Sequence, residues 1–122
     1  MDKTIVTILG VVFLAIGVLG FVNDPLLGIF EVDALHNIIH IISGALALVA
    51  VSMGASATRL FCRVFGIVYG LVAVLGFLMP GDMILGLFEA NLADDVLHLV
   101  LAVIFLYLGF GRGQSSQTPM SV

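Results

Sequence analysis

Residues 26–41 read LLGIFEVDALHNIIHI, and residues 84–99 read ILGLFEANLADDVLHL. When residue 26 is aligned with residue 84, the identical pairs include Gly28/Gly86, Phe30/Phe88, Glu31/Glu89 and His40/His98. A second pair of segments, residues 8–21 and 64–77, ends in VLGF in both copies. Internal repeats indicate a repeated structural unit. The pattern therefore predicts a duplicated helical hairpin, with two parallel copies related by an axis along the membrane normal.

The composition indicates a membrane protein. Of the 122 residues, 61% are hydrophobic and 10% are charged, whereas soluble domains carry about 25% charged residues. A membrane span needs about 20 apolar residues, and the stretches of that length are 4–22, 34–53, 60–79 and 92–110. We expect an all-α membrane protein with four transmembrane helices, as tandem hairpins over about 4–53 and 60–110. Residues 1–111 would form one bundle, and 112–122 a disordered cytoplasmic tail.

The basic and acidic residues are distributed differently along the chain. Lys3, Arg59, Arg63 and Arg112 fall at the N-terminus, in the connection between the second and third spans, and in the tail. Nearly all the acidic residues fall in the other two connections or at the helix starts that follow them. Because lysine and arginine mark cytoplasmic loops, we expect both termini in the cytoplasm. The four basic residues do not cluster, so nucleic acid is not an expected partner.

The two non-cytoplasmic connections, 23–32 and 81–90, are apolar with few charges and too short to span a membrane. We expect interfacial turns or short helices there, at the level of the lipid headgroups. Asp33 and Asn91 then fit as N-caps of the second and fourth helices, because their side chains accept hydrogen bonds from unpaired N–H groups. Asn91 followed three residues later by Asp94 approximates a capping box.

A polar cluster is predicted where these two helices begin. His36 and His40 are four residues apart and share a helix face, as do Asp94 and His98. Small residues lie further along the same face of each helix and would let the second and fourth helices approach closely. Asn37 follows His36 and Asp95 follows Asp94 in the sequence, so each lies at the side of the helix face that carries the cluster.

Four interpretations of this cluster are open. The first is structural: the groups hydrogen-bond one another, the caps and interfacial water, and hold the helices together. The second is a metal site formed by His36, His40, Asp94 and His98, a donor set that suits Zn, Cu or Fe. The third is haem or another pigment held between His40 and His98. The fourth is passage of protons or a solute along ionisable groups within the membrane.

The sequence shows no enzyme motif. No nucleophile lies beside a base, no phosphate-binding loop is present, and HNIIH lacks the glutamate that a zinc peptidase needs after its first histidine. The sequence therefore favours a non-enzymatic structural or accessory protein. The expected partners are the lipid bilayer, other membrane-protein subunits or further copies of the chain.

Two segments, LLGIFEVDALHNIIHIISGALAL and NLADDVLHLVLAV, resemble the small bacterial four-helix membrane proteins of the family named domain of unknown function 4383. The resemblance covers roughly residues 4–111. It implies the four-helix fold and a bacterial or archaeal cytoplasmic membrane, and it implies no activity. The positions that match the family's motifs are His36, Asn37, His40, Asn91, Asp94 and His98, whereas Asp95 stands where many members are expected to have asparagine.

Overall fold

The computed structural model describes residues 1–30 and 32–111. Its elements are α1 (Asp2–Leu19), α2 (Ala34–Met53), α3 (Ala55–Leu78), β1 (Met83–Ile84), β2 (Phe88–Glu89), α4 (Leu92–Leu106) and the π-helical turn η1 (Tyr107–Gly111). All four long helices, the last continuing through Gly111, are long and apolar enough to cross a membrane. The expected all-helical fold is thus confirmed. Glu31 of the aligned segments and the expected tail at 112–122 lie outside the described residues.

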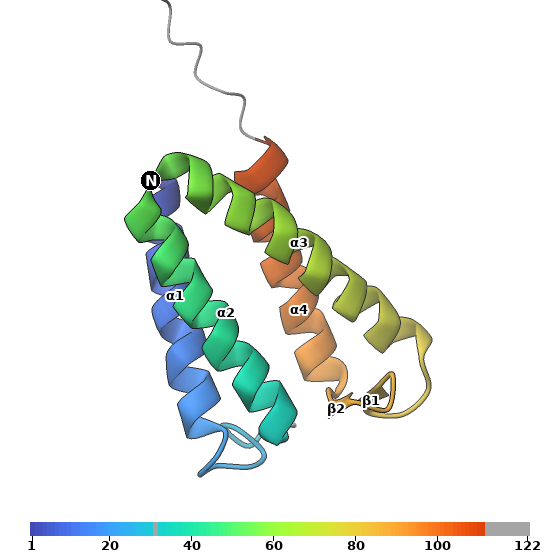
Figure 1. Cartoon of the computed structure of the whole chain (residues 1–122). Coiled ribbons are helices and arrows are strands. Elements are labelled where there is room, and N and C mark those ends of the chain that lie inside the picture. Colours follow the sequence, from blue (N-terminus) through green and yellow to red (C-terminus); the bar gives the residue numbers. More distant parts are fainter. Residues whose placement is uncertain (31, 112–122) are drawn as a thin grey trace, which may run out of the picture.

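The helices form two hairpins that lie side by side (Figure 1). The first hairpin pairs α1 with α2, and the second pairs α3 with α4. Gly54 alone separates α2 from α3, with φ of 115°, a conformation that L-residues with a side chain rarely adopt. The N-terminus, the junction of α2 with α3 and the end of α4 lie at one end of the molecule, and the two long connections lie at the other end.

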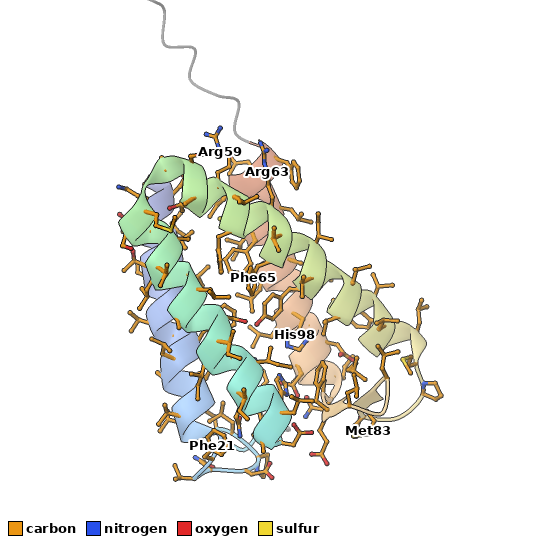
Figure 2. All side chains as sticks on the ribbon, viewed as in Figure 1. Phe21, Arg59, Arg63, Phe65, Met83 and His98 are labelled. Carbon is orange, nitrogen blue, oxygen red and sulfur yellow. The ribbon has the colours of Figure 1, made fainter. Side chains whose placement is uncertain are left out.

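The third helix begins at Ala55, five residues earlier than the sequence indicated. Residues 55–59 continue the helix because only Gly54 departs from helical geometry, and Thr58 Oγ1 donates a hydrogen bond of 2.8 Å to Gly54 O. Arg59 and Arg63 consequently lie on α3 and not in a loop. They still mark the end of the molecule that carries the N-terminus (Figure 2).

Both long connections form tight β-turns, the first of the two alternatives expected there. Leu27 and Gly28 have φ of 53° and 72°, and Leu85 and Gly86 have φ of 52° and 68°. Two successive positive φ values define the type I′ turn that closes short hairpins. The second turn joins β1 to β2, whose pairing brings Phe88 opposite Ile84. The strand β2 thereby lies against the start of α2, in the other hairpin.

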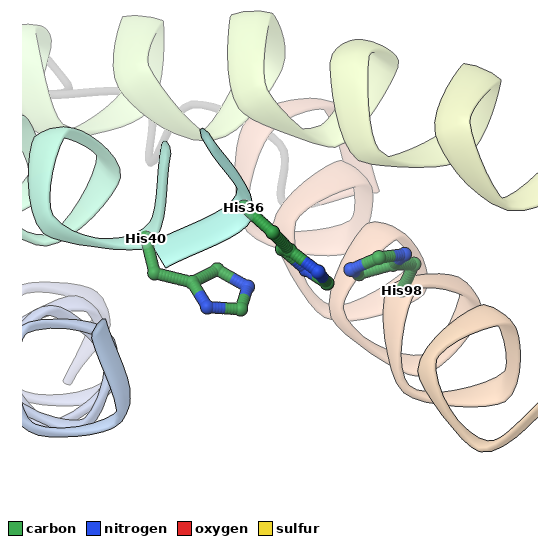
Figure 3. Close-up of side chains that lie close together, drawn as sticks. All are labelled: His36, His40 and His98. Atoms are coloured by element: carbon green, nitrogen blue, oxygen red, sulfur yellow. The ribbon is translucent and has the colours of Figure 1, made fainter. Parts of the chain in front are cut away.

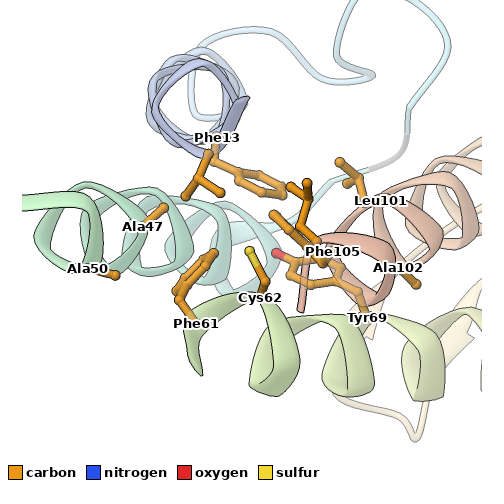
Figure 4. Packing of buried hydrophobic residues seen from close by; sticks show 11 residues of the cluster. Phe13, Ala47, Ala50, Phe61, Cys62, Tyr69, Leu101, Ala102 and Phe105 are labelled. Atoms are coloured by element: carbon orange, nitrogen blue, oxygen red, sulfur yellow. The ribbon is translucent and has the colours of Figure 1, made fainter. Parts of the chain in front are cut away.

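The core lies where the two hairpins meet and is rich in aromatic rings (Figure 4). The Phe13 ring of α1 is 5.5 Å from the Tyr69 ring of α3 and 6.3 Å from the Phe105 ring of α4. Cys62 is buried in this core as a free thiol. The outer faces are also apolar: Ile8, Val49 and Leu71, for example, are 58%, 52% and 60% exposed. Such a surface is expected of helices that contact lipid.

Candidate functional site

Three histidines from two helices meet next to this core. His36 and His40 lie on α2 and His98 lies on α4, and each side chain is at most 3% exposed. One ring nitrogen from each of the three lies within 4.8 Å of the others. Figure 3 shows His36 between His40 and His98, with ring centroids 4.4 Å from His40 and 5.6 Å from His98. We call these three residues the histidine cluster.

The orientation of the His36 ring is fixed by a closed set of hydrogen bonds. Asp33, the N-cap of α2, accepts from the backbone N–H of His36 through Oδ1 and from that of Glu89 through Oδ2, both at 2.8 Å. The Glu89 carbonyl in turn lies 2.7 Å from His36 Nδ1. Because a carbonyl can only accept, Nδ1 carries the proton and Nε2 keeps a lone pair. Metal-binding histidines are commonly oriented in this way, by donating their other ring N–H to a carbonyl or carboxylate.

The other two rings are held by packing instead. The His40 ring is 5.7 Å from the Phe13 ring, and the His98 ring is 5.5 Å from the Tyr69 ring. The Nδ1 atoms of His40 and His98 are buried and have no hydrogen-bond partner among residues 1–30 and 32–111. A buried polar group without a partner costs about 1–3 kcal/mol. Two such atoms therefore leave hydrogen-bonding capacity in the cluster that no described residue uses.

Asp94 was expected beside the histidines as a fourth ligand, and the structure places it at the start of α4. Its Oδ2 accepts from Asn91 N and its own N–H donates to Asn91 Oδ1, both at 3.0 Å, which completes a capping box. Asp94 is not among the residues whose ligand atoms converge in the histidine cluster. The Asn91 Nδ2 also donates to Ile29 O at 2.7 Å. The cap of α4 is thereby tied to the first connection, as the cap of α2 is tied to β2.

Asn37 and Asp95 point away from the histidine cluster, each toward a glycine of a VLGF segment. A Cβ built on Gly20 would lie 1.9 Å from Asn37 Oδ1, and one built on Gly76 would lie 1.9 Å from Asp95 Oδ1. In each pair a glycine C–H bond therefore aims almost directly at the oxygen. The Cα–O distance is then at most about 3.4 Å, which is the range of a Cα–H···O contact. These contacts join α2 to the end of α1 and α4 to α3.

The small residues on the histidine-bearing faces close the hairpins and do not bring α2 onto α4. A Cβ on Gly44 would meet Gly10 O of α1 at 2.6 Å, and Ala102 lies beside Gly70 of α3. The expectation that these residues let the second and fourth helices approach one another is therefore wrong. The two helices meet at their histidine side chains, next to a cavity.

That cavity, of about 250 Å³, lies between α2 and α3 beside the histidine cluster. Besides the three histidines, its walls are Ile39, Ser43, Phe65, Val68, Tyr69, Val72 and Phe88. Ser43 Oγ and Tyr69 Oη share a hydrogen bond of 3.0 Å. Tyr69 was missed from the sequence, although the signal was present: a phenol in the middle of an otherwise apolar span, in a chain with two tyrosines.

Taken together, four membrane-length helices, two capped connections and a buried trio of imidazoles define a small helical membrane protein with an internal polar site. The chain belongs to the family described as domain of unknown function (DUF4383), whose sequence profile matches residues 3–111. The suspected family is thus confirmed. No curated protein and no solved structure matches the chain.

Proposed function

We propose that this protein binds one transition-metal ion in the membrane through His36, His40 and His98. The observation that carries the proposal is the convergence of three buried imidazole nitrogens within 4.8 Å of one another. On a tetrahedral zinc ion with Zn–N bonds of about 2.0 Å, two ligand nitrogens lie roughly 3.3 Å apart. Side-chain rotations that close the nitrogens by about 1.5 Å or less would bring all three within bonding distance of one ion.

The polar contacts of the histidine cluster favour a ligand over mutual hydrogen bonding. A purely structural cluster would pair its imidazoles with one another or with the caps. His36 makes such a pairing, from Nδ1 to Glu89 O, while Nδ1 of His40 and of His98 lacks a partner among the described residues. A bound ion would take up ring nitrogens of both histidines. Imidazole donors suit zinc, copper and iron.

The dimensions of the site favour an ion over a haem. The adjacent cavity has a volume of about 250 Å³, below the range of roughly 300–1,000 Å³ usual for drug-sized ligands. The His40 and His98 ring centroids are 6.5 Å apart, but the His36 ring lies between them, 4.4 Å from His40 and 5.6 Å from His98. No flat space for a macrocycle is therefore left between the two rings proposed as axial ligands.

The orientation of the protein in the membrane, and the membrane in which it lies, are part of the same proposal. Lys3, Arg59 and Arg63 gather at the end that carries the N-terminus, and Asp33 and Glu89 lie at the opposite end. By the positive-inside rule, this distribution supports an N-in, C-in protein of a bacterial or archaeal cytoplasmic membrane. The aligned segments of the two hairpins support a tandem repeat. The histidine cluster would then lie in the outer half of the bilayer.

Elemental analysis of the detergent-purified protein tests the proposal. Wild type, reconstituted with Zn, Cu or Fe without chelator, is expected to hold close to one ion per chain. The variant His40→Ala/His98→Ala is expected to hold none. The control Thr58→Ala removes a buried polar group at the other end of the bundle, so it should keep the ion.

A metal-free wild type under these conditions overturns the proposal. If the double variant does not fold, the single variant His98→Gln, checked by circular dichroism, replaces it. A folded His98→Gln protein that binds the ion as tightly as wild type would also overturn the assignment.

A further inference from the structure

The cavity beside the histidine cluster opens on the outer, apolar side of the bundle. Its wall includes Val68, which is 46% exposed on the apolar outer face of α3. In Figure 2, Phe65 and His98 lie between the ribbons of α2 and α3, and both line this cavity. A molecule dissolved in the bilayer can therefore reach the imidazoles laterally without crossing an aqueous phase.

A second apolar groove continues the cavity toward the end of the molecule that carries Gly54. It has a volume of about 280 Å³, and its walls are Leu46, Val49, Ala50, Met53, Ala57, Leu60, Phe61, Val64 and Phe65. Phe65 lines both spaces. On α2 the residues lining the two spaces follow one another at helical spacing from His36 to Met53, and we refer to the cavity and the groove together as the seam. From Ser43 to Met53 the seam runs roughly 15 Å along the helix.

The chemistry of the seam differs between its two parts. The histidine end contains imidazoles, aromatic rings and the Ser43–Tyr69 hydroxyl pair, while every residue of the groove is apolar. None of the residues lining either space is Lys, Arg, Asp or Glu. A phosphate headgroup would thus find no cation there, whereas a neutral planar head with hydrogen-bonding oxygens would meet imidazoles, hydroxyls and ring faces.

We propose that the seam between α2 and α3 binds an isoprenoid quinone or its quinol, with the ring beside the histidine cluster and the tail in the groove. This ligand matches the neutral polar head that the cavity accommodates and the apolar chain that the groove accommodates. In the metal-free protein, the buried Nδ1 atoms of His40 and His98, which have no partner among residues 1–30 and 32–111, supply the hydrogen-bonding capacity. The inference goes beyond metal binding and does not require the metal, because the groove and most of the cavity wall are outside the proposed ligand set.

Binding of two fully substituted benzoquinones to metal-free protein in nanodiscs tests the inference, one quinone without a tail and one with a decyl tail. Val68→Trp fills the cavity and is expected to weaken the binding of both at least tenfold. Val49→Trp fills the groove, so it should keep the affinity for the tailless ring and lose the gain that the tail provides. Val74→Trp, on a 51% exposed position of α3 outside both spaces, should behave as wild type.

The inference is overturned if wild type binds neither quinone, or if the three tryptophan variants bind alike. It is also overturned if light scattering shows that the seam is buried between two copies that Val68→Trp separates. Metal content, measured separately on wild type reconstituted with the ion as described above, keeps the two proposals apart: a protein that binds quinone and no ion refutes only the metal site. One that binds an ion and no quinone refutes only the seam. Bound lipid acyl chains in place of quinone refute the seam as well.

Discussion

The contact between Gly76 and Asp95 should make position 76 intolerant of the smallest possible side chain. A Cβ on Gly76 would lie 1.9 Å from Asp95 Oδ1 and 2.4 Å from Asp95 Cγ, whereas ordinary contacts lie at 3.4–4 Å. The carboxylate would have to move by about 1.5 Å within a packed interface, and overpacking of this kind costs about 1–3 kcal/mol. We therefore expect the clash in Gly76→Ala to lower the free energy of unfolding by that amount, less the helix-propensity gain that alanine provides.

Gly70 provides a matched control on the same helix. A Cβ there would meet only Ala102 Cβ, at 3.7 Å, an ordinary contact. Gly70→Ala should therefore show only the helix-propensity gain of up to about 1 kcal/mol. The two substitutions are chemically identical and share the helix-propensity gain, so their difference of about 1–3 kcal/mol isolates the contact with Asp95.

Unfolding in mixed detergent and SDS micelles, followed by circular dichroism, measures both variants. Shortening the partner should rescue the first one, because Gly76→Ala/Asp95→Ala removes the atoms that clash. The double variant is then expected to be more stable than the sum of the single effects predicts. Equal stability of Gly76→Ala and Gly70→Ala would refute the reasoning.

Three further predictions concern caps, the basic end and the ion. Asp33→Ala removes two hydrogen bonds and should cost about 2 kcal/mol of unfolding free energy. Asp33→Asn should cost about half as much, because the amide oxygen can still cap α2 but the amide nitrogen cannot accept from Glu89 N. Equal losses for the two variants in SDS titrations would contradict this prediction. Arg63→Lys removes the 2.8 Å bond from Nε to Gly109 O and the stacking over Phe110, so it should cost about 1 kcal/mol, while Arg59→Lys should cost nothing measurable. Zinc at a hundredfold excess over its dissociation constant should stabilise wild type by about 2.7 kcal/mol, and an equal gain in His98→Ala would refute the ligand set.

The sequence predicted the helices and the caps because these depend on local patterns. Long apolar runs determine where spans lie, and Asp33 and Asn91 stand where an unpaired N–H group needs an acceptor. The common face of His36 and His40 followed from helix geometry alone. The turns in the connections depend on Leu–Gly pairs with positive φ, which the apolar composition of those segments concealed.

Other features depend on how the hairpins pack, which helical spacing does not encode. Asn37 is one residue from His36, about 100° round the helix, and this step turns it from the histidine cluster toward Gly20. The VLGF segments were visible in the sequence as a repeat. Their contacts with Asn37 and Asp95 could not be predicted, because these contacts depend on how the neighbouring helices pack. The cavity likewise arises between α2 and α3, so Tyr69 could not be assigned to it from spacing along one helix.

The position of residue 89 illustrates how backbone contacts shape what a family can vary. Its N–H and C=O groups hold Asp33 and His36, and neither contact uses the glutamate side chain. Nineteen of the genetically encoded residues could supply the same two groups, and only proline, which has no N–H, would fail. Relatives could therefore differ freely at this position while keeping the contact intact. In related sequences this contact would therefore exclude proline at the position, and it would not require glutamate there.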